Sequence, residues 1–350
     1  MIKHTLAQPV TLSAITLGVE TGLFSILVQG DGSPWALKEL ASKLEMQESF
    51  LGRLMRHLAA MGYLIETGPD NYLPTNFTRA LTLPLISAGY PLTLNAFMRS
   101  WVKFPAWARE HNYMAPESTL KTVLQYAFNT DLNMFDFFHS RPPNGVHFDN
   151  LMTGYRQGRP HWMDAGFYPV QEKLIQGLKP GADAVLLVDI GGGLGQDIVR
   201  FQSQYPEAPG RLVLQDQAVV TSKSIGIHDK IETMSYDFFT EQPVKGARAY
   251  YLHSVLHNWP DKACVQILKR VKEAMEPGYS RLLINDQVVP RTGAHWEVTA
   301  LDLEMMVLLG ARERVEEEWY QLLENMADLR VEKIWTLANG LESVIECVLR

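Results

Sequence analysis

The stretch that decides the fold reads Val185-Leu186-Leu187-Val188-Asp189-Ile190-Gly191-Gly192-Gly193-Leu194-Gly195. It opens with an apolar run of strand length, and the glycines follow at once. The next residues, 196–204, have the apolar spacing of a helix. A glycine loop between a buried strand and a helix lies at the carboxyl edge of an open α/β sheet, where such sheets bind ligands. The stretch therefore predicts a doubly wound sheet with a ligand at this loop.

Short apolar runs and helical patterns alternate on the C-terminal side of this loop. We expect strands at 211–215, 231–236, 247–253 and 281–286, and helices at 261–276, 297–309 and 316–326. Two closing strands, 329–335 and 343–349, are separated by a short turn and should form an antiparallel hairpin at the C-terminus. Alternating strands and helices predict a Rossmann-like α/β domain over residues 181–350.

The N-terminal half has helical patterns and one hairpin signal. Helices are expected at 14–27, at 35–41 with Ser33 as cap and Pro34 in the first position, and at 48–61. A strand at 63–67, a turn and a return at 72–74 follow. This order is the winged-helix pattern, so we expect a winged-helix-like domain over 1–110. Residues 111–180 are expected to form a helical linker and substrate-lid region.

Charge and composition limit the partners. The net charge is -7, from 32 basic and 39 acidic residues, whereas nucleic-acid binding needs a basic face. The helix that would read DNA, 48–58, carries only Arg53 and Arg56 as cations. The apolar stretch 10–28 is interrupted by polar residues, which argues against a membrane span or a secretory signal. Two cysteines give no disulfide framework, which fits a reducing compartment. Taken together, these features predict a cytoplasmic protein that binds neither nucleic acid nor membrane.

The spacing of the glycines distinguishes between cofactors. A dinucleotide site needs G-x-G-x-x-G, but counting from Gly191 gives G-x-G-x-G, and Gln196 occupies the last glycine position. Asp189 would repel a pyrophosphate and would suit the ammonium of an amino acid. Asp216 ends the second strand, where an acid accepts hydrogen bonds from ribose hydroxyls. A nucleoside joined to an amino acid without phosphates describes S-adenosylmethionine (SAM).

A histidine and an acid follow neighbouring expected strands of the same sheet, and a second acid follows the next helix. His257 lies just past one strand, Asp286 ends the next, and Glu313 follows the next helix. A phenol with a pKa of about 10 is a poor nucleophile at pH 7, and a histidine with a pKa of about 6.5 can take its proton. His253 and His257 also have the spacing of a zinc pair, but we find no third ligand and expect no metal.

Five motifs resemble one family. They are Val188-Asp189-Ile190-Gly191-Gly192-Gly193-Leu194-Gly195, Leu214-Gln215-Asp216, Tyr236-Asp237-Phe238-Phe239, Leu256-His257-Asn258-Trp259-Pro260-Asp261 and Gly310-Ala311-Arg312-Glu313-Arg314-Val315. The chain resembles the plant and fungal O-methyltransferases that include caffeate- and flavonoid-methylating enzymes, and looks closest to fungal members of secondary metabolism. The resemblance implies a SAM-dependent O-methyltransferase and a homodimer, with the N-terminal half serving as dimerisation and lid domain.

The resemblance also assigns roles. SAM would be bound by Asp189, Gly191, Gly193, Gly195 and Asp216, with Asp237 and Phe238 at the adenine. His257 would be the general base, flanked and oriented by Asp286 and Glu313. The aromatic-rich segment 85–178 predicts an apolar pocket for a flat substrate. We expect this pocket to be lined by Phe135, Phe148, Met152, Trp162, Asn258 and Met305. The acceptor would be a phenol or enol of an aromatic or polyketide-derived metabolite.

The sequence departs from the family pattern around the catalytic residues. Asn258 replaces an aspartate, Asp286 replaces a glutamate, and Val315 replaces a threonine. A second hypothesis therefore stays open: an enzyme of this fold that uses SAM as a fixed, unconsumed positive charge for dehydration or pericyclic cyclisation. Fungal relatives of that kind tend to replace the catalytic histidine. The retention of His257 favours methyl transfer.

Overall fold

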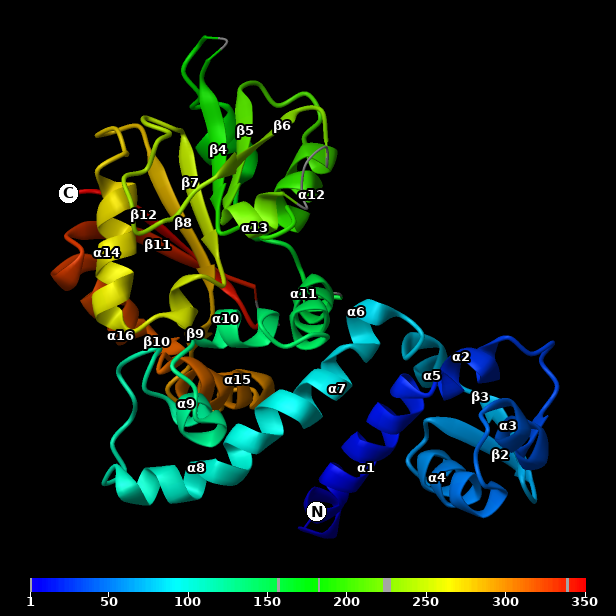
Figure 1. Cartoon of the computed structure of the whole chain (residues 1–350). Coiled ribbons are helices and arrows are strands. Elements are labelled where there is room, and N and C mark those ends of the chain that lie inside the picture. Colours follow the sequence, from blue (N-terminus) through cyan, green and yellow to red (C-terminus); the bar gives the residue numbers. More distant parts are fainter. Residues whose placement is uncertain (1, 156–157, 182, 223–227, 338–339) are drawn as a thin grey trace. The chain divides into compact units, whose positions relative to one another are not determined.

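The computed structural model describes residues 2–155, 158–181, 183–222, 228–337 and 340–350 (Figure 1). The chain forms two compact units. One contains residues 1–109 and 123–157, and the other contains residues 110–122 and 158–350. The segment 110–180 is thus divided between the units.

The first unit is mainly helical. Its elements are α1 (Ile2–Glu20), α2 (Leu23–Val28), β1 (Trp35–Ala36), α3 (Leu37–Lys43), α4 (Glu48–Ala60), β2 (Leu64–Gly68), β3 (Asn71–Pro74), α5 (Asn76–Ala80), α6 (Pro84–Ser87), α7 (Gly89–Leu92), the π-helix η1 (Thr93–Phe97), α8 (Met98–Glu110), α9 (Val123–Phe128), α10 (Met134–His139) and α11 (Asn144–Gly154). The strands form an antiparallel sheet in the order β1-β3-β2. On α4, Leu51, Met55 and Leu58 are fully buried.

The helix expected to start at Trp35 begins two residues later. Trp35 and Ala36 form β1 and pair with Tyr72 and Asn71 of β3. Helix α3 then starts at Leu37, and its N-terminus has no side-chain cap. The predicted cap at Ser33 and first position at Pro34 are wrong because sheet pairing takes the residues that would have formed the first helical turn.

The apolar segment 14–27 is two helices that the unit itself covers. Gly22 has a φ of 73° and separates α1 from α2. Ile15, Leu23, Phe24 and Leu27 are at most 1% exposed and pack in one core with residues of α3, α4, β2 and β3. The hydrophobicity of this segment is therefore explained within one chain and does not require a partner subunit.

The second unit is built on a mostly parallel sheet (Figure 1). Its strands are β4 (Val185–Ile190), β5 (Arg211–Asp216), β6 (Ile231–Ser235), β7 (Ala249–His253), β8 (Arg281–Asp286), β11 (Leu329–Thr336) and β12 (Ser343–Leu349), in the order β11-β12-β8-β7-β4-β5-β6. The five from β6 to β8 run parallel. β12 is antiparallel to β8, and β11 is antiparallel to β12. The predicted α/β class with a mostly parallel sheet is confirmed.

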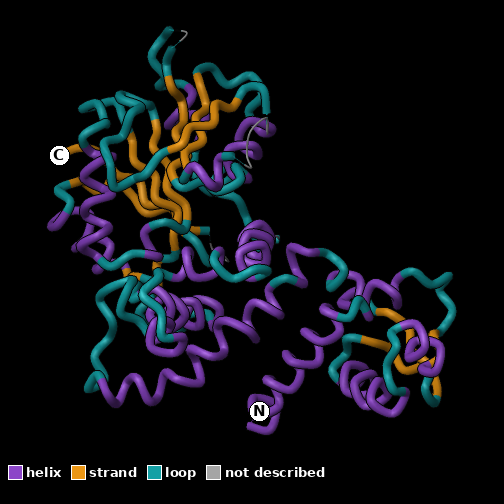
Figure 2. Tube along the Cα trace, viewed as in Figure 1, coloured by secondary structure: helices purple, strands orange, loops and turns teal. Residues whose placement is uncertain are grey.

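Helices cover both faces of this sheet, as Figure 2 shows. They are the π-helix η2 (Gln171–Ile175), α12 (Gln196–Gln204), α13 (Ala218–Thr221), the 3-10 turn η3 (Leu256–Asn258), α14 (Asp261–Lys272), α15 (Trp296–Leu309), α16 (Glu316–Tyr320) and the π-helix η4 (Gln321–Met326). One core joins one face of the sheet to α14, α16 and η4, and a second joins the other face to α12 and η2. The two short strands β9 (Val288–Val289) and β10 (Arg314–Val315), which the sequence pattern did not indicate, pair in parallel.

Within the described part of the chain, no helix combines the length and hydropathy needed to cross a membrane.

Candidate active site

The glycine loop after β4 adopts a conformation that requires glycine. Gly191, Gly193 and Gly195 have φ values of 70°, 60° and 87°, in the left-handed region. A Cβ on Gly192 would lie 2.5 Å from Leu214 Cδ1 and 2.6 Å from the Asp189 carboxyl group. The loop therefore lies directly against β5 and the end of β4. Glycines allow a backbone to approach a ligand closely. Such a cradle fits the amino-acid end of SAM.

Asp216 is attached to this loop. Its Oδ2 accepts a hydrogen bond from the Gly193 amide at 2.8 Å, and its Oδ1 accepts one from the Gln217 amide at 2.7 Å. Burial raises the pKa of Asp216, while the two amide bonds act in the opposite direction. Asp216, the acid predicted at the end of the second strand, thus lies beside the glycine loop. Its carboxylate has further lone pairs that can accept hydrogen bonds from ribose hydroxyls.

Two further predicted cofactor residues, Asp189 and Phe238, lie beside the loop. Asp189 is 1% exposed, and its carboxyl group packs against Gly192, so it supports the loop from within the sheet. The Cε1 atom of Phe238 lies 3.9 Å from the position that a Gly191 Cβ would occupy. Asp237 Oδ1 accepts a bond from the Phe239 amide at 3.0 Å, which fixes the turn that presents Phe238.

His257 is held by a buried glutamate. Its Nδ1 lies 2.6 Å from Glu313 Oε1, and the two residues are 7% and 4% exposed. Glu313 is itself held, because its amide donates to Asp302 Oδ1 at 2.9 Å. An Nδ1 proton bonded to the carboxylate leaves His257 Nε2 as the basic nitrogen, the arrangement that hydrolase triads use.

The pKa values of this cluster follow from its burial. Burial lowers the pKa of His257, but the charge and hydrogen bond of Glu313, together with Asp286, outweigh it and raise the pKa above 6.5. Burial raises the pKa of Asp286 to about 7. Among the described residues, neither carboxyl oxygen of Asp286 has a hydrogen-bond partner. Glu313 therefore orients the imidazole through a hydrogen bond, whereas Asp286 acts on it only through charge.

His253 belongs to a different network. Its Nδ1 lies 2.6 Å from Asp197 Oδ2, and its Nε2 lies 3.5 Å from Glu342 Oε2. The hydroxyl of Tyr251 also donates to Asp197. Sequence reasoning missed Asp197, whose only signal was an acid in the first turn after the glycine loop. The two histidines thus bond different carboxylates, and the described residues contain no cluster suited to a metal ion.

The predicted substrate residues divide between the units. Phe135 and Phe148 stack edge to face at 5.9 Å in the first unit, where Met152 is 44% exposed. In the second unit, the Asn258 amide donates to the Ser254 carbonyl at 2.8 Å, and Met305 is 8% exposed.

Trp162 lies in the core of the second unit. It is 0% exposed and stacks between Phe201 of α12 at 5.8 Å and Tyr251 of β7 at 4.9 Å. The indole therefore stabilises the contact between α12 and the sheet.

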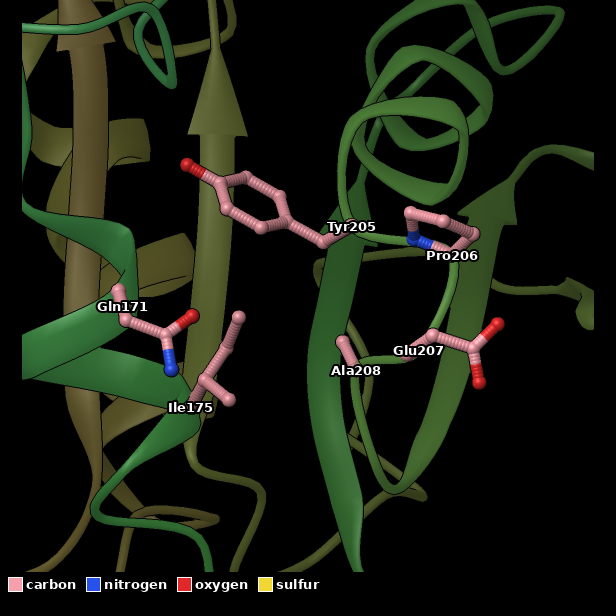
Figure 3. A pocket seen from close by; sticks show the side chains of 6 residues that line it. All are labelled: Gln171, Ile175, Tyr205, Pro206, Glu207 and Ala208. Carbon is pink, nitrogen blue, oxygen red and sulfur yellow. The ribbon is translucent and has the colours of Figure 1, made fainter.

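A cavity of about 240 Å³ lies elsewhere (Figure 3). It is lined by Gln171, Ile175, Tyr205, Pro206, Glu207 and Ala208. Figure 3 shows the Tyr205 ring extending toward the side of Gln171 and Ile175, whereas the Glu207 carboxylate points away. The loop with Pro206 leads into the amino end of β5, while the glycine loop follows the carboxyl end of β4. This cavity is therefore at the edge opposite the candidate site.

Comparisons with known proteins show the family of the chain. Residues 171–327 match the model of the O-methyltransferase domain family. Methyltransferase cfoC of Aspergillus candidus is 38% identical over 333 residues, which cover 95% of this chain and 82% of that protein. Demethylsterigmatocystin 6-O-methyltransferase of Aspergillus parasiticus is 35% identical over 328 residues, covering 93% and 82%. The chain belongs to the O-methyltransferase family, and SAM is its cofactor.

Solved structures share the whole fold. The structure of LepI in complex with SAM is 29% identical and superposes with a TM-score of 0.93, covering 100% of this chain and 88% of that one. A structure described as a pericyclic reaction enzyme gives the same identity and TM-score, covering 100% and 89%. Both the methylating and the pericyclic kind of enzyme are thus represented among the proteins that this chain resembles.

Proposed function

We propose that this O-methyltransferase methylates a phenolic or enolic hydroxyl of an aromatic or polyketide-derived secondary metabolite, with His257 as the general base. The observation that carries the proposal is the 2.6 Å contact between His257 Nδ1 and Glu313. It fixes one ring nitrogen on a carboxylate and leaves the other to accept a proton. A similar enzyme of Aspergillus parasiticus is named for methylating demethylsterigmatocystin at oxygen, which supports this substrate class.

The chain's own residues account for the proton transfer. Bound SAM supplies the methyl group as an electrophile on a positively charged sulfur. His257 Nε2 takes the hydroxyl proton while the acceptor oxygen forms its bond to the methyl carbon and the bond from that carbon to sulfur breaks. Glu313 stabilises the imidazolium that results, and S-adenosylhomocysteine leaves with the electron pair on sulfur. In this proposal SAM is bound by Asp189, Gly191, Gly193, Gly195 and Asp216, with Asp237 and Phe238 at the adenine.

A second candidate function rests on the solved structures. A pericyclic reaction enzyme superposes on this chain with a TM-score of 0.93, and Asp286 stands where a glutamate was expected. In that case SAM would act as a fixed positive charge and would not be consumed. Incubation with SAM and candidate phenols and enols, followed by mass spectrometry, separates the two functions. Products carrying one added methyl group support transfer, and isomerised or dehydrated products without it support the second function.

The pH dependence of the wild type tests the protonation state of His257. Only the neutral imidazole can accept the proton, and its pKa is raised above 6.5. We therefore expect kcat/KM to rise with pH through an apparent pKa above 6.5. In Glu313→Gln the main group that raises this pKa is lost, so the acid limb should move to lower pH. An acid limb that stays in place in this variant would show that Glu313 does not control the base.

We also propose that the N-terminal part is a winged-helix-like domain through which the enzyme forms a homodimer. Residues 1–110 would form this domain, residues 111–180 the lid region, and the C-terminal strands 329–336 and 343–349 the hairpin that completes the catalytic domain. Apolar side chains remain exposed in the first unit, among them Val10 at 59% and Val102 at 71%. Most homo-oligomers are two-fold dimers that use the same patch twice.

Light scattering tests the dimer. We expect the mass of two chains at micromolar concentration, and a shift toward the mass of one chain in the double variant Val10→Asp, Val102→Asp. The matched control is Trp296→Asp, because Trp296 is 69% exposed but lies in the second unit. A monomeric wild type would contradict the proposal.

A further inference from the structure

Arg314 follows Glu313 directly in the chain and is 0% exposed. Its Nη2 and Nε lie 2.8 Å and 3.1 Å from Asp261 Oδ1. Its Nη1 donates to the carbonyl of Leu256 at 3.2 Å, and Nη2 donates to that of Trp259 at 3.0 Å. All three nitrogens of the guanidinium group are therefore bonded within residues 256–261, a short loop that ends at the first residue of α14.

This loop carries His257. The carbonyl of Leu256 lies just before the histidine and that of Trp259 lies two residues after it, so Arg314 fixes the backbone on both sides. Glu313, the neighbour of Arg314 in sequence, binds the imidazole itself. Two adjacent residues thus hold the ring and the backbone of the same histidine.

We propose that Arg314 is a positioning residue for methyl transfer, which fixes the His257 loop relative to Glu313 so that Nε2 faces the acceptor hydroxyl. The inference rests on the proposed role of His257 as general base. A planar guanidinium is suited to this task, because its donors have a fixed geometry that a lysine ammonium lacks. The centroid of the Trp319 ring lies 5.2 Å from the guanidinium carbon of Arg314, so the indole packs against the guanidinium group.

Arg312 provides a matched control in the same segment. It bonds the other oxygen of Asp261, Oδ2, at 3.1 Å, and it bonds Glu318 at 2.9 Å. Its side chain is 51% exposed, whereas that of Arg314 is 1% exposed. Exposed ion pairs contribute little because water screens them. The two arginines therefore share a carboxylate but differ in burial and in their contacts with the His257 loop.

Arg314→Lys keeps the positive charge but removes the planar guanidinium group. We expect kcat to fall by ~10–100-fold, because a small displacement of a catalytic group costs up to about 100-fold. The SAM dissociation constant should be unchanged, since Arg314 contacts none of the glycine loop. Arg312→Lys should leave kcat within about twofold of the wild type.

A double-mutant cycle with Glu313→Gln separates positioning from a general structural role. If both residues act through one imidazole, the loss of the double variant should be smaller than the product of the single losses. NMR of histidine-labelled protein adds a readout that does not depend on activity: the Nδ1 proton resonance of His257, assigned with His257→Gln, should shift upfield in Arg314→Lys and stay in place in Arg312→Lys.

The inference would be overturned if the kcat loss of the double variant equals the product of the two single losses and the His257 Nδ1 proton resonance does not move in Arg314→Lys. If Arg314→Lys does not fold, Asp261→Asn tests the same loop from its partly exposed side, where the carboxylate is 31% exposed. It should give a smaller fall in kcat and the same resonance shift. If Asp261→Asn shows neither of these two effects, the role of Arg314 is refuted. Failure of the proposed function is distinct, because the wild type would then release no S-adenosylhomocysteine.

Discussion

Replacing His257 with glutamine is expected to slow methyl transfer by roughly 10²–10⁴-fold, the usual contribution of a general base. The glutamine amide can still donate a hydrogen bond to Glu313, so the buried carboxylate is not left without a partner. It cannot accept the acceptor's proton. The rate of product formation is measured by mass spectrometry. The affinity for SAM, measured by calorimetry, should change little because the imidazole acts on the acceptor.

Glu313→Gln is the matched comparison for this loss. It removes the carboxylate that orients the imidazole and stabilises its protonated form. The proton acceptor stays in place, so we expect a smaller fall in kcat. His257→Ala should be as slow as His257→Gln and in addition less stable, because it leaves Glu313 buried without its partner. A His257→Gln variant that keeps the wild-type rate would remove His257 from the mechanism.

Asp216→Ala should weaken SAM binding by ~2–4 kcal/mol, since hydrogen bonds to a charged group are worth ~1.5–3 kcal/mol each. This corresponds to roughly a 30- to 900-fold higher dissociation constant at 1.36 kcal/mol per factor of ten. Two effects add here. The variant loses an acceptor for the ribose hydroxyls, and it loses the bond that fastens the Gly193 amide.

Calorimetry with SAM measures this loss, and Glu232→Gln is the control. Glu232 lies on the neighbouring strand β6 and pairs with Arg211 at the surface, so its loss should leave SAM binding unchanged. Equal affinities for wild type and Asp216→Ala would show that the acid at the end of β5 does not contact the cofactor.

The sequence allowed the second unit to be predicted well because its signals are local. The apolar run of β4 and the glycines after it occupy the predicted positions, and strand β8 ends at Asp286 as expected. Acids and histidine that each follow a parallel strand must meet at one sheet edge. This rule placed His257 and Asp286 at the same edge, whereas Glu313 follows a helix and was assigned to the site by the family resemblance.

Features that depend on pairing between distant segments could not be predicted. Trp35 reads as the start of a helix, but its backbone pairs with Tyr72 in β3. Nothing in the pattern of apolar and polar residues around Arg314 indicates that its guanidinium group reaches the His257 loop. The sequence likewise did not indicate that the Asp286 carboxyl group has no hydrogen-bond partner among the described residues.

The most direct test of methyl transfer is its stoichiometry. Purified enzyme is incubated with SAM and an acceptor, and S-adenosylhomocysteine and product are quantified in the same sample. The account predicts one S-adenosylhomocysteine released for each methylated product, and no turnover when S-adenosylhomocysteine replaces SAM. Product that accumulates over many cycles while SAM remains unconsumed would contradict methyl transfer, and His257 would then be assigned to hydrogen bonding with a substrate carbonyl or hydroxyl.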